Sequence, residues 1–269
     1  WGLVCPAETP EGEACGLVNN LARMCYITVG TSDEPIVDFM TQRNMEVLGE
    51  LKPQVSPNGI KVLVNGDWVG IHRDALQLVS KMENLCRGNI NFQAVSFICD
   101  NRERGFKIYT DIRRVCWPLF VIDNDPKTEN SGGLVLNKEL IRNLEFDTHL
   151  PTDLGPEERR EQYFGWDGLV RYGAVEYVVA EEEGCIMFVM SPRILRYIRQ
   201  LKVGYAMPED VIRDRNMRAW SIISQRAHKW THRNYSSMIL GVCATIINLT
   251  DNYQSTGNSI SVLWANKPW

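Results

Sequence analysis

The alternation of apolar and polar positions predicts a β-hairpin in the first third of the chain. Residues 60–64 and 67–71 each carry alternating apolar side chains, and they flank the pair Asn65-Gly66. That pair tolerates the positive φ angles that a type I′ turn requires. We therefore expect two antiparallel strands joined by a two-residue turn.

Helical spacing follows directly after this hairpin. Asp74 is placed to cap the free amides of a first turn, Gln77 completes a capping box, and Gly88 supplies the stop. One apolar face runs along the predicted helix and consists of Ala75, Leu78, Val79, Met82, Leu85 and Cys86. We expect Leu78, Val79, Met82 and Leu85 of this helix to be buried against one face of the hairpin.

Weaker patterns predict the other elements. A helix should begin near Pro35, with Ile36, Phe39 and Met40 on its buried side. Further strands are expected at 106–110, 115–122, 174–179 and 185–190, and helices at 137–146 and 156–172. Periodicity does not decide between strand and short helix at 21–29 and 238–247. The fold class is α+β, with mixed short strands and helices.

Composition restricts the class of protein. The chain has 269 residues, of which 44% are hydrophobic and 23% charged, enough for one or two domains with real cores. It contains no apolar run of about 18 residues, so we expect no membrane span. The net charge of -4 argues against autonomous nucleic-acid binding. Because the chain opens at Trp1 without Met, we interpret it as a piece of a longer protein.

No complete catalytic or metal-binding pattern is present. The eight cysteines form no Cys-x-x-Cys pair, which favours reduced thiols. Asp123-Asn124-Asp125 has the carboxylates for Mg²⁺ but is typical of a turn, and Glu181–Glu183 resembles a solvated hairpin tip more than a cation site. A Cys5–His72 hydrolase pair is conceivable, but the spacing does not support it.

A long motif at the start of the chain identifies a family. Residues 5–12 read Cys-Pro-Ala-Glu-Thr-Pro-Glu-Gly, which has no periodic or low-complexity explanation. The motif resembles the fork-region signature of the second-largest subunits of multisubunit RNA polymerases. Similarity to the RNA polymerase II form, with a fungal character, continues at 64–73, 106–111, 159–169, 176–183 and 237–242.

The resemblance implies a fragment of a multidomain polymerase subunit with four parts. They would be the end of a fork-region domain, a small α+β external domain, a second α+β external domain and the start of a hybrid-binding domain. The corresponding boundaries are 1–34, 35–118, 119–207 and 208–269.

The family's activity is DNA-templated RNA synthesis in the nucleus. Its second-largest subunit forms one side of the active-centre cleft, where Mg²⁺ assists attack of the RNA 3′-hydroxyl on the α-phosphate of a ribonucleotide. The implied partners are the largest subunit, other polymerase subunits, the DNA template and the RNA–DNA hybrid, and no membrane. The family's metal ligands lie beyond Trp269, so we expect no catalytic residue, no metal site and no activity in the isolated chain. Two alternatives are the same subunit of another multisubunit RNA polymerase and a non-catalytic interaction module derived from it.

The resemblance also indicates residues near the active centre and the nucleic acid. They are Glu8, Thr9, Glu11, Gly12, Gln254 and Ser255. The first four lie in a loop whose glycine and proline suit close approach of backbone to nucleic acid. A second interpretation is that Glu8 and Glu11 only brace this loop through backbone hydrogen bonds. The family's arginine in the segment 251–258, which faces nucleotide phosphates, is absent from this sequence.

The end of the chain departs from the family. Where the family reads Met-Gly-Lys-Gln-Ala-Met-Gly, this chain ends Leu-Trp-Ala-Asn-Lys-Pro-Trp at 263–269. Codons for the family peptide give this ending when they are read out of frame. We therefore interpret residues from about Thr256 onward as frame-slipped, with a shorter slip near Arg233. A segment never selected to fold is expected to lack coherent packing.

Overall fold

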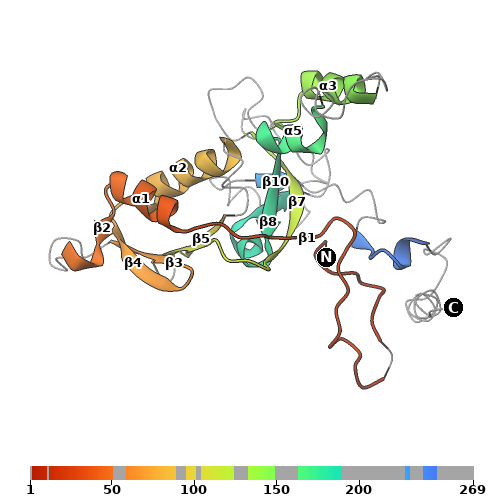
Figure 1. The fold of residues 1–269 in the computed structure, drawn as a ribbon, viewed down its shortest axis with the longest axis horizontal. Coiled ribbons are helices and arrows are strands. Elements are labelled where there is room, and N and C mark those ends of the chain that lie inside the picture. Colours follow the sequence, from red (N-terminus) through yellow and green to blue (C-terminus); the bar gives the residue numbers. More distant parts are fainter. Residues whose placement is uncertain are drawn as a thin grey trace, which may run out of the picture.

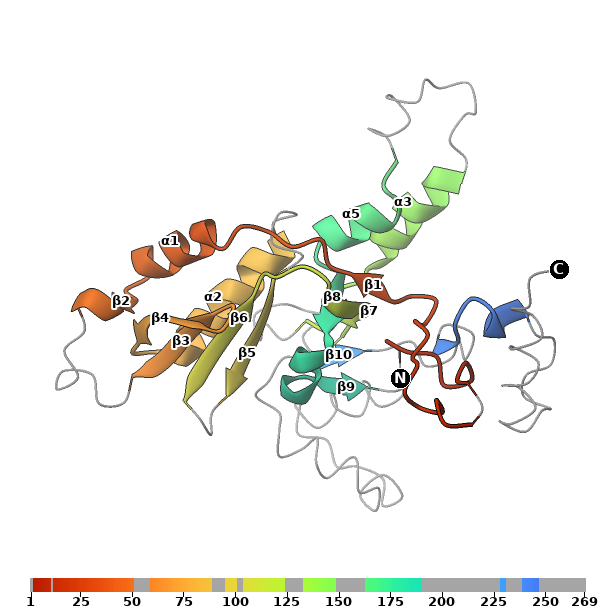
Figure 2. The ribbon, with the colours of Figure 1, turned by 60° about the horizontal axis from the view of Figure 1, so that its bottom comes forward.

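Two mixed sheets, each covered by helices, make up the fold in a computed structural model (Figures 1 and 2). The structure describes residues 2–10, 12–50, 59–88, 95–100, 104–123, 133–148, 163–189, 228–230 and 239–246. Helices and mixed sheets alternate along the chain, so the predicted α+β class is confirmed. Within the described parts, every helix is too short or too polar to cross a membrane.

The first sheet contains the predicted hairpin. Asn65 and Gly66 have φ angles of 50° and 97°, which confirms the expected turn with positive φ at both positions. Strand β6 (Gly105–Tyr109), the second strand after the helix that follows the hairpin, pairs in parallel with the first hairpin strand, β3 (Ile60–Val64). The sheet has the order β2-β4-β3-β6-β5, with bounds Glu46–Val47, Asp67–His72, Ile60–Val64, Gly105–Tyr109 and Ser96–Asp100. Strand β5 was not predicted from the sequence.

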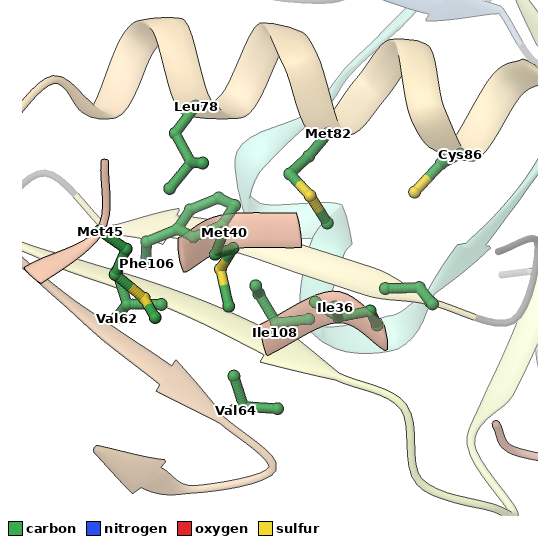
Figure 3. Packing of buried hydrophobic residues seen from close by; sticks show 11 residues of the cluster. Ile36, Met40, Met45, Val62, Val64, Leu78, Met82, Cys86, Phe106 and Ile108 are labelled. Atoms are coloured by element: carbon green, nitrogen blue, oxygen red, sulfur yellow. The ribbon is translucent and has the colours of Figure 1, made fainter. Parts of the chain in front are cut away.

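Helices α1 (Glu34–Gln42) and α2 (Ala75–Gly88) pack on one face of this sheet. Figure 3 shows side chains from α2 pointing toward those of α1 and the strands. The buried cluster consists of Ile36, Met40, Met45, Val62, Val64, Leu78, Met82, Cys86, Val95, Phe106 and Ile108. Leu78 and Met82 are buried as predicted, whereas Val79 is partly buried at the edge and Leu85 is half-buried outside the cluster.

The start of α2 is held differently from the predicted capping box. The Gln77 N–H donates to Asp74 Oδ1 at 3.2 Å, so the cap itself is confirmed. The Asp74 N–H, however, donates to His72 Nδ1 at 3.0 Å. Because Nδ1 accepts, Nε2 carries the proton and donates to the Arg43 carbonyl at 3.0 Å. His72 therefore ties the end of α1 to the start of α2, a structural role.

The second sheet is built around β7 (Val115–Val121). It also contains β1, β8, β9 and β10, with bounds Tyr26–Ile27, Val175–Val179, Met187–Val189 and His228–Trp230. Strands β1, β8 and β10 all pair antiparallel with β7, and β9 pairs in parallel with β10. Helices α3 (Lys138–Thr148) and α5 (Gly165–Arg171) accompany this sheet. Their core consists of Leu140, Leu169, Val170, Ala174 and Val175.

Within the described ranges, short 3₁₀ turns also occur at Leu48–Glu50, Ala180–Cys185 and Ala244–Ile246. The sequence left strand or short helix open for 238–247. The described residues 239–246 form turns and a 3₁₀ helix rather than a strand. This segment lies beside the N-terminal loop in both views (Figures 1 and 2). The first part of the predicted helix at 156–172, before residue 163, falls outside the described residues, and so does the tail from Thr256 that we interpret as frame-slipped.

Candidate functional site

The opening loop is anchored at its base and exposed at its tip. An isolated bridge joins Val4 to Leu21, and the Cys5 N–H donates to the Asn20 carbonyl at 2.8 Å. Gly2, with φ at 125°, packs so closely on Trp117 that an added Cβ would lie 2.5 Å from the ring. At the tip, Leu17 is 79% exposed. The contacts at the base of the loop therefore fix the position of the solvent-exposed turn at its tip.

Glu8 lies at the boundary between the buried base and the exposed tip. Its residue is only 6% exposed, and its Oε1 accepts a hydrogen bond from the Ala244 N–H at 2.7 Å. Cys5 and Ala244 form a small buried cluster there, with Ala7, Leu240 and Cys243 packed against it. Glu8 thus braces the loop against backbone, the second of the two interpretations of the sequence, although the partner lies far away in the chain. Its proximity to nucleic acid stays a prediction.

The residues after Glu8 shape the exposed turn. Thr9 Oγ1 accepts from the Gly16 N–H at 3.0 Å, and the Cys15 N–H donates to the Gly12 carbonyl at 3.1 Å. Gly12 is exposed and has a φ of 90°, a conformation that glycine adopts without strain. Thr9 and Gly12 therefore lie in one ordered turn. The other predicted site residues, Glu11, Gln254 and Ser255, are outside the described residues.

Sequence reasoning did not predict which segment would meet the loop. The Arg23 N–H donates to the Leu240 carbonyl at 2.9 Å, a second link to the segment 239–246. Gly241 lies so close to Glu8 that an added Cβ would be 2.7 Å from Oε1. The glycine at 241 was visible in the sequence, but nothing near it indicated a carboxylate 233 positions earlier. The structure thus brings together the two ends of the described chain.

A second buried carboxylate lies between the two sheets. Glu182 is 3% exposed, and its two oxygens accept from the Phe97 N–H at 3.0 Å and the Val179 N–H at 3.1 Å. Phe97 belongs to β5 of the first sheet and Val179 to β8 of the second. The prediction of a solvated hairpin tip at 181–183 is therefore wrong for Glu182. Strand β9 pairs with β10 and β8 pairs with β7, and no pairing between β8 and β9 occurs among the described residues.

Arg114 lies at the same junction. Its Nη1 donates to Ser96 Oγ and its Nε donates to the Asp111 carbonyl at 2.9 Å. Burial lowers the pKa of this guanidinium, and the nearby Glu182 carboxylate acts against that effect. Trp117 Nε1 donates to Glu183 Oε1 at 3.0 Å. Side chains from both sheets therefore meet in one hydrogen-bonded junction.

The other candidate chemistries do not assemble. His72 has both ring nitrogens engaged by backbone, and Cys5 packs in the separate cluster beside Ala244. Asn124 and Asp125 are outside the described residues. Among the described residues, no group of three acidic, histidine or cysteine side chains is arranged to hold a metal ion.

None of the eight cysteines forms a disulfide in the structure. Cys25 and Cys116 both direct their sulfur toward the Tyr26 carbonyl, at 3.9 and 3.3 Å. Burial raises the pKa of the Cys116 thiol to about 12, and burial also raises the pKa of Cys25. Cys15 lies exposed on the opening loop. The thiols therefore differ strongly in accessibility and in readiness to form a thiolate.

We expect native-state alkylation at pH 8 to modify Cys15 and spare Cys116. Because the pKa of Cys116 rises from 9.0 to about 12 on folding, the unfolded thiol ionises first. The neutral, buried Cys116 thiol thus contributes fully to the stability of the folded chain below pH 9, and this contribution is lost as the pH rises toward 12. Mass spectrometry of peptides after timed iodoacetamide treatment measures both sites. Equal labelling rates for the two cysteines in the folded chain would contradict the buried position.

Comparison with known proteins places the chain in a family. The family models described as RNA polymerase Rpb2 domains 3, 4 and 5 match residues 1–27, 62–123 and 166–234. The DNA-directed RNA polymerase II subunit RPB2 of Schizosaccharomyces pombe is 42% identical over 260 residues, and the same subunit of Meyerozyma guilliermondii is 43% identical over 267. Each alignment covers 96% of this chain.

The chain spans about a fifth of the length of these relatives, since each alignment covers 21% of the relative. The RNA polymerase III subunit RPC2 of Drosophila melanogaster is 34% identical over 126 residues, which is 46% of this chain and 11% of that protein. Three successive domain models of one subunit match in their proper order along the sequence. The chain therefore belongs to the RNA polymerase Rpb2 family.

Proposed function

We propose that this chain is part of the second-largest subunit of RNA polymerase II and acts in DNA-templated RNA synthesis within the assembled nuclear enzyme. Its role there is to form part of one side of the active-centre cleft. The observation that carries the proposal is the 42–43% identity to two RPB2 subunits of RNA polymerase II over 96% of this chain. The contact between Glu8 and Ala244 fits this role, because it brings the signature loop against the segment that leads toward 251–258, where the family's other nucleic-acid-facing residues occur.

The extent of the similarity supports RNA polymerase II over RNA polymerase III. Relatives named as subunits of RNA polymerase II match 96% of this chain at 34–43% identity. The RPC2 subunit of Schizosaccharomyces pombe matches 68% of it at 30% identity. A chain from an RNA polymerase III subunit would be expected to show the opposite order.

The proposal gives the exposed turn a role at the nucleic acid. Thr9, Glu11 and Gly12 would lie near the downstream end of the RNA–DNA hybrid, with Gln254 and Ser255 contributed by the later segment. The described part of this chain has no metal-ligand cluster, so other parts of the assembled enzyme would supply the ligands for Mg²⁺. The partners would be the largest subunit, the other subunits, the DNA template and the hybrid. The four-part division at 34, 118 and 207 belongs to the same proposal.

We expect the isolated chain to show no nucleotidyl transfer and only weak nucleic-acid affinity. Its net charge is -4, and affinity for nucleic acid depends mainly on neutralising phosphates. Primer extension with Mg²⁺ and ribonucleotides, beside a filter-binding assay, measures both properties. Template-dependent RNA made by the isolated chain would contradict the expectation.

The proposed function itself is tested on the assembled enzyme. An antibody against this chain should recover the largest polymerase subunit together with RNA-synthesising activity that is sensitive to Mg²⁺ removal. Recovery of the protein without a largest subunit would instead indicate a non-catalytic module. A tagged subunit that supports RNA synthesis when it replaces the endogenous one would establish the role.

A further inference from the structure

We propose that Glu8 is a positioning residue, whose carboxylate sets the place of the exposed turn that starts at Thr9. This inference rests on the proposed function, because the turn matters for RNA synthesis only if it faces nucleic acid. The carboxylate acts by length and hydrogen bonding rather than by contact with a ligand. Its partner is the backbone of the segment 239–246, and Gly241 is the residue that admits it.

The first support is the direction of the side chain. Glu8 is 6% exposed, and its Oε1 lies 2.7 Å from the Ala244 nitrogen, which is 236 positions away in the chain. A carboxylate aimed at solvent or at a nucleic acid would not be buried against an N–H of its own chain. The bond is charge-assisted, since an ionised acceptor binds a backbone N–H more strongly than a neutral one does.

The second support is the fixed backbone of Glu8. The Asn20 Nδ2 donates to the Glu8 carbonyl at 3.1 Å, so the returning segment of the loop holds the backbone of Glu8 while Ala244 holds its side chain. Thr9, the next residue, is tied across the turn to Gly16. A shift of Glu8 would therefore move the whole turn rather than one side chain.

The third support is the space left at Gly241. A Cβ added there would lie 2.7 Å from Glu8 Oε1 and 2.8 Å from Oε2, well inside normal contact. The Gly241 carbonyl accepts from the Thr245 N–H at 3.1 Å, so its backbone is held within the same turn. A methyl group at 241 would push the carboxylate away from Ala244. Two independent substitutions, at 8 and at 241, thus break one contact.

A role that depends on the length of the Glu8 side chain and a role that depends on its charge predict opposite orders of activity for Glu8→Gln and Glu8→Asp. Glu8→Gln keeps the length and an oxygen acceptor at the position of Oε1 but loses the charge. Glu8→Asp keeps the charge but is one methylene shorter, so it does not reach Ala244 from the same backbone. A positioning role predicts that Gln works better than Asp. A direct action of the charge on a metal or nucleic acid predicts the reverse.

The experiment uses the assembled polymerase with the full-length subunit carrying Glu8→Gln, Glu8→Asp or Glu8→Ala. Single-nucleotide addition on a defined RNA–DNA scaffold is measured over a range of ribonucleotide concentrations. We expect Glu8→Gln to stay within about twofold of the unsubstituted rate. Glu8→Asp and Glu8→Ala should lose about ten- to a hundredfold in maximal rate, with little change in the apparent KM, as for small misplacements in other active sites. Glu139→Gln, at an exposed position of α3 outside the loop, is the control and should leave the rate unchanged.

A double-mutant cycle closes the test. Gly241→Ala alone should lower the rate, but it should add little in a Glu8→Ala background, where no carboxylate remains to be displaced. The proposal is overturned if Asp works better than Gln, if the two effects simply add, or if reduced assembly of the subunit accounts for all of the lost rate. Failure of the unsubstituted subunit to support RNA synthesis would count against the proposed function instead.

Discussion

Glu182→Ala is expected to destabilise the folded chain by about 3 kcal/mol, because each buried N–H left without an acceptor costs about 1–3 kcal/mol. The substitution removes both acceptors, one for Phe97 in the first sheet and one for Val179 in the second. It also removes the negative charge that offsets the desolvation of Arg114. Urea unfolding of the purified chain, followed by circular dichroism and tryptophan fluorescence, measures the change.

Glu181→Ala is the matched control for this prediction. Glu181 lies in the same 3₁₀ turn but is exposed, so its removal should change the free energy of unfolding by less than about 0.5 kcal/mol. Because Glu182 joins the two sheets, we also expect the two spectroscopic probes to separate in Glu182→Ala. Equal midpoints for Glu182→Ala and Glu181→Ala would show that the junction does not depend on this carboxylate.

The local elements of the first sheet were predictable because their causes are local. The Asn65-Gly66 turn and the Asp74 cap need only neighbouring residues, and the structure has both. Strand β5 was missed because only its pairing with β6 shows that Ser96–Asp100 is extended. In the same way, the partner of the Asp74 N–H became clear only once β4 had placed His72 before the helix.

Buried carboxylates were the main failure of sequence reasoning. Glu182 stands between two other glutamates in an acidic run, a pattern typical of a solvated surface. In the structure its carboxylate accepts hydrogen bonds from one N–H of β5, 85 positions away, and from one N–H of β8. Glu8 is a similar case, because its partner is 236 positions away. A single sequence does not display contacts over such separations.

The candidate site divides along the same line. The motif at 5–12 was sufficient to indicate the family, and the family models confirm it. The motif alone left two roles open for Glu8; the structure adds a buried hydrogen bond from Ala244, and proximity to nucleic acid stays a prediction. The sequence therefore indicated which residues belong to the site, but it did not indicate contacts between residues that are far apart in the chain.

Leu78→Ala is expected to cost about 2–5 kcal/mol of folding free energy, since it leaves a cavity in a packed core. Leu78 is 1% exposed and lies among Val62, Met82 and Phe106 (Figure 3). Leu85→Ala is the control, because it makes the same change in the same helix at a half-buried position outside that cluster. Helix propensity changes equally in both variants, so the difference between their urea midpoints isolates packing. Similar midpoints would mean that α2 does not rest on the sheet through Leu78.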